Sequence, residues 1–337
     1  MKIKILSRKF IKPSTPTPEK LRTYKISCTD EVNPTMNVVG LFYYPSTDNI
    51  GNLNNLEKSL EEIFPQFYPF AGRYIKENYS VDCSDEGVEY VEAQVDHELL
   101  EIIGSGVEPV ELNDLLPVEV GAADEANDPV IIVDAASLGT FFFAWAKATR
   151  GDNTEPIIPN VDFPSYFPSE NLGELDFGTT GTRDPTTVTK RILFDKKAIA
   201  NLRARVSHLY KNSDRPASRV LVVSSFLSEV LIRCDRKKLG KTRACLISQA
   251  VNIRERTVPP LSKYSWGNLV SLGMVECCAE ETKSLNFEHL VTLLGNAARK
   301  AVSDCVKLLT NVDGHKILVD VFASAADKSN DENLNGI

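Results

Sequence analysis

A carboxylate at the start of an apolar helix is the clearest candidate for chemistry in this sequence. Asp134 is followed by Ala-Ala-Ser137, and apolar side chains then recur at helical spacing: Leu138, Phe141, Phe142 and Trp145. Since aspartate is a favoured N-cap, we expect a helix that begins near Ala135. The preceding run Val130–Val133 is apolar and β-branched, as at the end of a buried strand. A strand that leads a carboxylate into a helix is a common place for catalytic residues.

Other catalytic arrangements have weaker support. The sequence contains four histidines: His97, His208, His289 and His315. We expect each to be a surface histidine; His315, for example, stands five residues before an aspartate and follows the wrong kind of element. No Ser-His-Asp order with a nucleophile elbow, glycine-rich phosphate loop or metal-ligand cluster occurs in the sequence.

Cysteine usage argues against zinc sites and disulfide frameworks. The seven cysteines are odd in number, scattered and without a CxxC pair: Cys28, Cys83, Cys234, Cys245, Cys277, Cys278 and Cys305. The adjacent pair Cys277-Cys278 ends an apolar run, which favours a half-buried strand over a reactive site.

Length and composition indicate a soluble protein of two domains. The chain has 337 residues, 42% of them hydrophobic, and a net charge of −8 from 46 acidic and 38 basic side chains. This acidic balance argues against a nucleic-acid partner, which would need a basic face. No apolar segment reaches the length of a membrane span, and the first residues lack the apolar core of a secretory signal. We therefore expect a cytoplasmic protein with no membrane partner.

Periodicity predicts the elements of the first half. Residues 1–12 and 36–44 read as strands, and 53–67 as an amphipathic helix with Leu60 and Phe64 on its apolar face. A turn at 67–73 leads into the next strand. Residues 82–93 read as a hairpin with its turn at 84–87.

The second half begins after a segment rich in Pro, Gly, Asp and Thr, residues 151–189, which we interpret as an interdomain linker. The predicted strands are 190–194 and 244–253. The predicted helices start at Lys196, at Pro216 (capped near Ser218) and at Phe287. On the second helix we place the following side chains in the core: Val220, Val223, Phe226, Leu227, Val230 and Leu231. The third runs to Leu309. Residues 327–337 read as a polar, frayed tail.

Three motifs in the right order resemble the BAHD acyltransferases, a family of plant enzymes. Asp134-Ala-Ala-Ser-Leu-Gly-Thr-Phe-Phe142 is similar to the second half of the HxxxD signature. The turn Tyr68-Pro-Phe-Ala-Gly-Arg73 looks like a motif of the family's N-terminal half. Val251-Asn-Ile-Arg-Glu-Arg-Thr-Val-Pro-Pro-Leu261, followed by Gly267-Asn268, resembles its second-domain signature. The resemblance extends from about residue 3 to residue 310.

The resemblance implies an α/β fold with a two-domain, chloramphenicol acetyltransferase-like architecture, in which mixed sheets are flanked by helices. It places an N-terminal domain at 1–150, the linker at 151–189, a C-terminal domain at 190–326 and the tail at 327–337. The second domain is expected to be incomplete, since the family's DFGWG loop does not occur in this sequence.

The resemblance also implies direct acyl transfer from coenzyme A to an alcohol, with a histidine as general base four residues before the aspartate. Val130 stands at that position, so no catalytic residue is retained. The sequence from Asp128 joins Asp134 almost directly, and the simplest interpretation is a deletion of the strand that carries the histidine. A splice variant and a faulty gene model remain open.

Further roles follow from the same resemblance. Asp134 is expected to form an interdomain ion pair with Arg254, and the candidates for the substrate and CoA channel are Ser137, Asn252, Gly267 and Asn268. The opening residues look closest to a branch of alkaloid acetyltransferases, which favours acetyl-CoA as co-substrate for a small-molecule alcohol, no bound cofactor or metal, and a monomer. The alternative is a non-catalytic remnant that binds a ligand or a partner.

Overall fold

The computed structural model describes residues 2–32, 40–44, 53–104, 109–116, 133–152, 154–172, 175, 190, 192–211, 215–331 and 334–336. The chain forms two compact units. Unit 1 consists of Met1–Glu174, Thr180–Arg191 and Ser262–Leu269, and unit 2 of Leu175–Thr179, Ile192–Leu261 and Val270–Ile337. Residues 262–269, which the sequence places in the second domain, thus belong to unit 1. In the part of the chain that the structure describes, no helix has the length and apolar character needed to cross a membrane.

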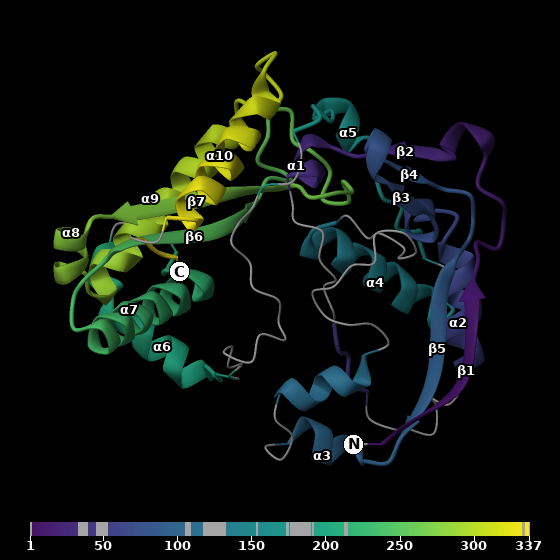
Figure 1. Cartoon of the computed structure of the whole chain (residues 1–337), viewed down its shortest axis with the longest axis horizontal. Helices are drawn as coiled ribbons and strands as arrows, with labels where there is room; N and C mark the ends of the chain where they lie inside the picture. The colour runs from purple at the N-terminus through teal and green to yellow at the C-terminus, as the bar shows by residue number, and fades with distance from the viewer. Residues whose placement is uncertain are drawn as a thin grey trace. The chain divides into compact units, whose positions relative to one another are not determined.

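Small antiparallel sheets make up the β-structure of unit 1 (Figure 1). β1 (Ile3–Ile11) pairs with β5 (Val88–Val95), with a register shift between Ile5 and Ser7. In the second sheet β4 (Ser80–Asp82) lies between β2 (Thr23–Lys25) and β3 (Arg73–Ile75). The strand predicted at the start of the chain and the strand predicted to begin at Arg73 are confirmed.

The predicted hairpin at 82–93 is wrong, because β4 and β5 belong to different sheets. Both edges of β4 are occupied by β2 and β3, so no edge remains for β5. The connecting residues are bound elsewhere: the Asp85 carboxylate accepts hydrogen bonds from the Thr17 amide (2.8 Å) and hydroxyl (2.6 Å). The amide of Gly87, at φ +89°, donates to the carbonyl of Ala71. The turn is therefore a connection between sheets.

The strand predicted at 36–44 is not supported by its described part. Residues 40–44 have no regular secondary structure, and 36–39 lie outside the described residues. The helical elements of unit 1 are α1 (Cys28–Glu31), α2 (Leu53–Ile63), α3 (Leu99–Ile103), α4 (Ala135–Thr149), α5 (Phe163–Tyr166) and 3₁₀ helices at Glu19–Leu21, Tyr68–Ala71, Lys76–Asn78 and Pro109–Leu115. α5 falls within the predicted linker, whose described start is therefore packed: Ile157, Phe163 and Phe167 are buried.

Aromatic side chains form the core of unit 1. The Phe141 ring of α4 lies against those of Phe67 and Phe70, at centroid distances of 5.3 and 4.6 Å. Trp266, only 2% exposed, contacts the same two rings. α2 packs along α4, and the Trp145 indole N–H donates to the carbonyl of Leu56 (3.1 Å). The aromatic residues predicted to face inward from α4 thus do so.

The sheet of unit 2 contains β6 (Ala244–Asn252), β7 (Val270–Cys277) and β8 (Leu334–Gly336). β6 pairs with β7 antiparallel and with β8 parallel. The predicted strand at 190–194 is wrong in its described part. Ile192 to Phe194 have no regular structure, and Leu193 is 87% exposed. An apolar run is therefore not sufficient for a strand when it packs on no sheet.

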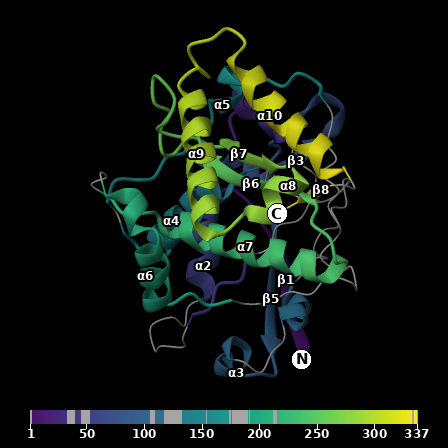
Figure 2. The ribbon, with the colours of Figure 1, turned by 90° about the vertical axis from the view of Figure 1, so that its left-hand side faces the viewer.

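The described helices of unit 2 include the three predicted ones, which start at Lys196, after Ser218 and at Phe287, and two that were not predicted. They are α6 (Lys196–Arg205), α7 (Arg219–Leu239), α8 (Ala279–Ser284), α9 (Phe287–Cys305) and α10 (Gly314–Ser329). Asp195, Ser218 and Asn286 accept the capping hydrogen bonds of α6, α7 and α9. α9 and α10 pack against β6 and β7, and α7 packs against α9 (Figure 2).

Three expectations about these helices need correction. On α7 the predicted core residues Val220 and Leu231 are 71% and 50% exposed, because the buried stripe instead runs through Val222 and Ile232. The expected polar tail at 327–337 is partly ordered, because α10 continues to Ser329. β8 then pairs with an edge of β6, with Leu334 opposite Ala244.

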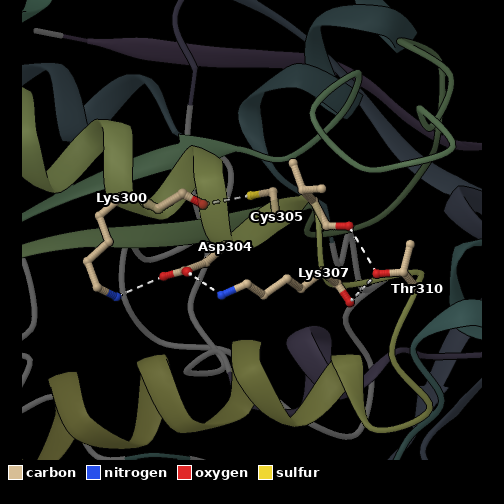
Figure 3. Close-up of polar contacts among 7 residues, drawn as sticks. Lys300, Asp304, Cys305, Lys307 and Thr310 are labelled. Carbon is tan, nitrogen blue, oxygen red and sulfur yellow. Dashed lines mark hydrogen bonds and ion pairs between the residues drawn. The ribbon is translucent and has the colours of Figure 1, made fainter.

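The third correction concerns the end of α9, predicted at Leu309 but found at Cys305 (Figure 3). The hydroxyl of Thr310 lies 3.3 Å from the carbonyl oxygens of Val306 and Lys307 and can donate to them. Such a bond satisfies carbonyls that have no partner within the helix, so the chain can turn here. The carboxylate of Asp304 lies between the ammonium groups of Lys300 (2.8 Å) and Lys307 (3.6 Å), which are exposed pairs of small energetic value.

The burial of the cysteines leads to a prediction about their reactivity. Cys234 and Cys278 are exposed, whereas the other five are buried. Burial raises the pKa of Cys28 and of Cys83 to about 12, and that of Cys277 and Cys305 to about 11. Since the thiolate is the reactive form, we expect a disulfide reagent at pH 8 to modify two thiols rapidly in the folded chain and all seven in denaturant. Rapid native modification of five or more would contradict this burial.

Candidate active site

The N-terminus of α4 has the geometry predicted from the sequence. Asp134 is extended (φ −76°, ψ 171°), and its Oδ1 accepts a hydrogen bond from the Ser137 amide at 2.9 Å. This is an N-cap, because the carboxylate satisfies one of the amides that has no carbonyl partner within the helix. The helix start at Ala135 is therefore confirmed.

Asp134 also joins α4 to a segment far away in the sequence. Its second oxygen, Oδ2, accepts from the Leu269 amide at 3.1 Å, and its own amide donates to the carbonyl of Gly267 at 3.3 Å. Leu269 is fully buried. The aspartate thus fixes both the first turn of α4 and the residues 267–269 that lie beside it.

Ser137 strengthens the same connection. Its side chain is 1% exposed, and its Oγ donates to the carbonyl of Gly267 (3.1 Å) while the Gly267 amide lies 3.2 Å from Oγ. Gly267 has φ +125°, and a Cβ there would lie 3.2 Å from the Phe163 ring. Glycine at 267 therefore allows the close approach of the segment to α4.

Asn268 is held by a buried carboxylate that sequence reasoning missed. Asp30 is 6% exposed, and its Oδ1 accepts from the backbone amide (3.2 Å) and side-chain amide (2.9 Å) of Asn268. Its Oδ2 accepts from the amide and hydroxyl of Ser27, at 2.8 and 2.7 Å. Burial raises the pKa of Asp30, and this effect outweighs the opposite effect of the hydrogen bonds from Ser27 and Asn268.

Two further candidates lie together in unit 2, at the end of β6 and two residues beyond it. Arg254 is 4% exposed, and its backbone amide and guanidinium Nη1 donate to Oδ1 of Asn252, at 3.0 and 3.1 Å. The guanidinium of Arg256 donates to the carbonyl of Asn252. Glu255 between them has φ +60°, so the chain bends sharply here.

The predicted site residues therefore form two groups. Asp134, Ser137, Gly267 and Asn268 meet in unit 1, whereas Asn252 and Arg254 meet in unit 2. The ion pair between Asp134 and Arg254, which would join the units, stays a prediction, as do the channel roles of these residues. Val130 lies outside the described residues.

Three of the four histidines are exposed, in agreement with the expectation of surface histidines. His97 and His208 are exposed and lie beside Asp96 (2.7 Å) and Glu288 (3.5 Å). His289 is exposed on α9, and His315 lies at the start of α10. Among the residues that the structure describes, no three His, Cys, Asp or Glu side chains lie close enough to hold a metal ion.

Part of the missed cluster has a readable sequence signal. Ser27-Cys-Thr-Asp30 has the Ser-x-x-acid spacing of a capping box, and both reciprocal bonds are present. That signal predicts the helix start but not the bond to Asn268, which is 238 residues away. Long-range partners of this kind are not encoded in local spacing.

Comparison with known proteins agrees with the motifs and the fold. The family model described as Transferase family matches residues 1–133 and 131–313. The chain belongs to this family of plant acyltransferases, the BAHD family.

Individual relatives cover nearly the whole chain. It is 33% identical to vinorine synthase of Rauvolfia serpentina over 330 residues, which include 89% of this chain and 76% of that protein. It is 33% identical to stemmadenine O-acetyltransferase of Catharanthus roseus, with 91% of this chain and 78% of that protein covered. A pelargonidin 3-O-(6-caffeoylglucoside) 5-O-(6-O-malonylglucoside) 4'''-malonyltransferase of Salvia splendens is 31% identical, with 95% and 79% covered.

The fold matches solved structures as well. The crystal structure of vinorine synthase superposes with a TM-score of 0.78 at 28% identity and covers 99% of this chain and 83% of that chain. The mixed α/β architecture of small sheets flanked by helices is therefore confirmed. F. graminearum TRI101, complexed with coenzyme A and deoxynivalenol, shares the fold at a TM-score of 0.53 and 13% identity.

Proposed function

We propose that this chain has the scaffold of an acyl-CoA-dependent O-acyltransferase that acts on a hydroxyl of a plant specialised metabolite. The observation that carries the proposal is the aspartate of the motif, Asp134, which caps α4 and binds the Leu269 amide. The names of the relatives, an O-acetyltransferase and a malonyltransferase among them, support acyl transfer as the reaction.

The proposed reaction is a direct transfer without an acyl-enzyme. The hydroxyl oxygen attacks the thioester carbonyl, the C–S bond breaks, and the hydroxyl proton passes through a base to the departing thiolate of CoA. Because valine occupies position 130, the motif supplies no proton acceptor. Loss of a general base typically lowers the rate by about 10²–10⁴. Binding and orientation still contribute, so we expect slow turnover.

We infer that a missing internal segment has placed valine at position 130. The family model matches the chain in two stretches that meet at residues 131–133. The alignment with vinorine synthase runs over 330 residues but includes only 89% of the 337 residues, so it has internal positions where this chain has no residue. Both facts support the deletion that we place between Asp128 and Asp134. The transcript between these codons would identify an exon that encodes the missing histidine.

A basic surface of unit 2 supports a co-substrate with phosphate groups, such as acetyl-CoA. In a chain of net charge −8, the stretch from α6 to the start of α7 carries these cations: Lys196, Lys197, Arg203, Arg205, Lys211, Arg215 and Arg219. A hollow of about 370 Å³ lies in this stretch, lined by Arg203, Ser207 and Tyr210 among others. A guanidinium that lines a hollow attracts an anionic group such as a phosphate. We further propose that the protein acts as a cytoplasmic monomer, with small molecules as its partners.

A second candidate function is a non-catalytic remnant that binds a ligand or a partner protein. The observation that favours it is Val130, since a chain without the base keeps the scaffold but not the chemistry. The two candidates differ in turnover rather than in ligand binding.

The test is a thiol-release assay with acetyl-CoA and a panel of alcohols, combined with calorimetric titration by CoA. We expect binding of CoA and a slow release of thiol that depends on the alcohol. Binding with release at the acceptor-free background would remove the catalytic proposal and leave the second candidate. Absence of both binding and release would contradict the acyl-CoA scaffold itself.

A further inference from the structure

α1 is unusual because it is short, acidic and buried. All four of its residues, Cys28–Glu31, are buried, and it contains two carboxylates: Asp30 is 6% exposed and Glu31 is 3% exposed. A buried carboxylate is unfavourable unless hydrogen bonds compensate for the lost water. The hydrogen-bond partners of these two carboxylates therefore indicate the structural role of α1.

Asp30 and its neighbour Thr29 form hydrogen bonds with three groups of Asn268: its backbone amide, its side-chain amide and its carbonyl. The Asp30 carboxylate accepts from both amides of Asn268, and the Thr29 hydroxyl donates to the Asn268 carbonyl at 2.8 Å. The hydroxyl oxygens of Thr29 and Ser27 lie 2.9 Å apart, so the side chains around Asp30 are closely packed. The backbone of Asn268 is thus fixed next to Leu269, whose amide binds Asp134.

Glu31 binds a different segment. Its carboxylate accepts from the amides of Glu170 (3.0 Å) and Asn171 (3.2 Å) and from the hydroxyl of Ser169. The amide of Cys28 donates to the carbonyl of Phe167 at 3.0 Å. Residues 167–171 are therefore held by the same four-residue helix.

The two bound segments have a common place in the chain. Residues 167–171 come just before the first stretch of unit 1 ends at Glu174. Residues 262–269 enter unit 1 from unit 2 and lead directly into β7, which starts at Val270. Both are points where the chain passes between units, and α1 holds each of them on unit 1.

We propose that α1 is the anchor of these two crossings and that Asp30 is a positioning residue for Asp134. The relay runs from the Asp30 carboxylate to Asn268, and from the adjacent Leu269 amide to the carboxylate that caps α4. Asp30 acts on Asp134 indirectly, because it fixes the segment whose Leu269 amide Asp134 binds. The inference rests on the proposed function only in treating Asp134 as part of the acyl-transfer site.

Amide hydrogen exchange on the full chain tests this proposal without depending on activity. Asparagine has one side-chain oxygen where aspartate has two, so in Asp30→Asn either the Ser27 donors or the Asn268 donors lose their acceptor. We expect the amides of Asn268 and Leu269 to exchange roughly tenfold faster or more. Those of Glu170 and Asn171 should be unchanged. Glu31→Gln should give the reverse pattern, since it affects only 169–171.

Matched controls keep a general loss of stability distinct from a local one. Glu19→Gln and Asp320→Asn replace exposed acids and should leave all these amides unchanged. The exchanged pair Asp30→Asn with Asn268→Asp recreates an amide–carboxylate bond and should restore part of the protection at Leu269. Faster exchange at Asn268 with no change at Leu269 would overturn the positioning role. If either single variant lost amide protection equally at 268–269 and at 169–171, the claim that Asp30 and Glu31 hold different segments would be overturned. Failure of CoA binding in the unmodified chain would affect the proposed function alone.

Discussion

Replacing Phe141 by alanine is expected to destabilise unit 1 by about 3–5 kcal/mol, the effect typical of a large aromatic residue removed from a packed core. The Phe141 ring is 8% exposed and lies between the rings of Phe67 and Phe70, at 5.3 and 4.6 Å. Its removal leaves a cavity that rigid aromatic neighbours fill poorly. Urea unfolding, followed by the fluorescence of the nearby Trp145 and Trp266, measures the effect.

Phe143→Ala is the matched control on the same helix. Phe143 is 58% exposed, so removing it opens no cavity, and we expect a change within about 0.5 kcal/mol. Equal destabilisation by the two substitutions would mean that α4 does not present the face described here.

Replacing Asp134 by alanine is the second large effect that we expect. The substitution removes the N-cap bond to the Ser137 amide, for about 0.5–2 kcal/mol. It also leaves the amide of the buried Leu269 without this acceptor, for about a further 1–3 kcal/mol. Together these predict a loss of about 1.5–5 kcal/mol in the stability of unit 1.

Asp195→Ala separates the two contributions, because Asp195 caps α6 through the Ala198 amide at an exposed position. We expect about 0.5–2 kcal/mol there, the same range as for the cap bond of Asp134 alone. A double-mutant cycle of Asp134→Ala with Arg254→Ala tests the proposed ion pair between these residues. Additive losses in the cycle would contradict that pair.

Local signals predicted the parts of this structure that local interactions determine. The helix starts at Ala135 and after Ser218 follow from a capping Asp or Ser just before an apolar periodic run. The motif residues Asp134, Ser137 and Gly267 were also found, and the structure brings them together.

The wrong or missing predictions concern which strands pair and which residues form long-range hydrogen bonds, rather than the local propensity for helix or strand. Residues 82–93 have the sequence of a hairpin, but β4 already has two neighbours and β5 pairs with β1. Asp30 reads as a capping residue, yet its second role depends on Asn268, far along the chain. Such contacts are decided by tertiary packing, which a single sequence does not encode in its spacing.

The most direct test of the central claim compares rates of CoA-thiol release, with water and with a shared panel of alcohols as acceptors. The three samples are this chain, a relative that carries the motif histidine, and the variant of that relative with valine in place of the histidine. We predict that this chain resembles the valine variant and falls about 10²–10⁴ below the parent relative. Release at the parent's rate would contradict the claim that this acyltransferase scaffold has lost its proton acceptor.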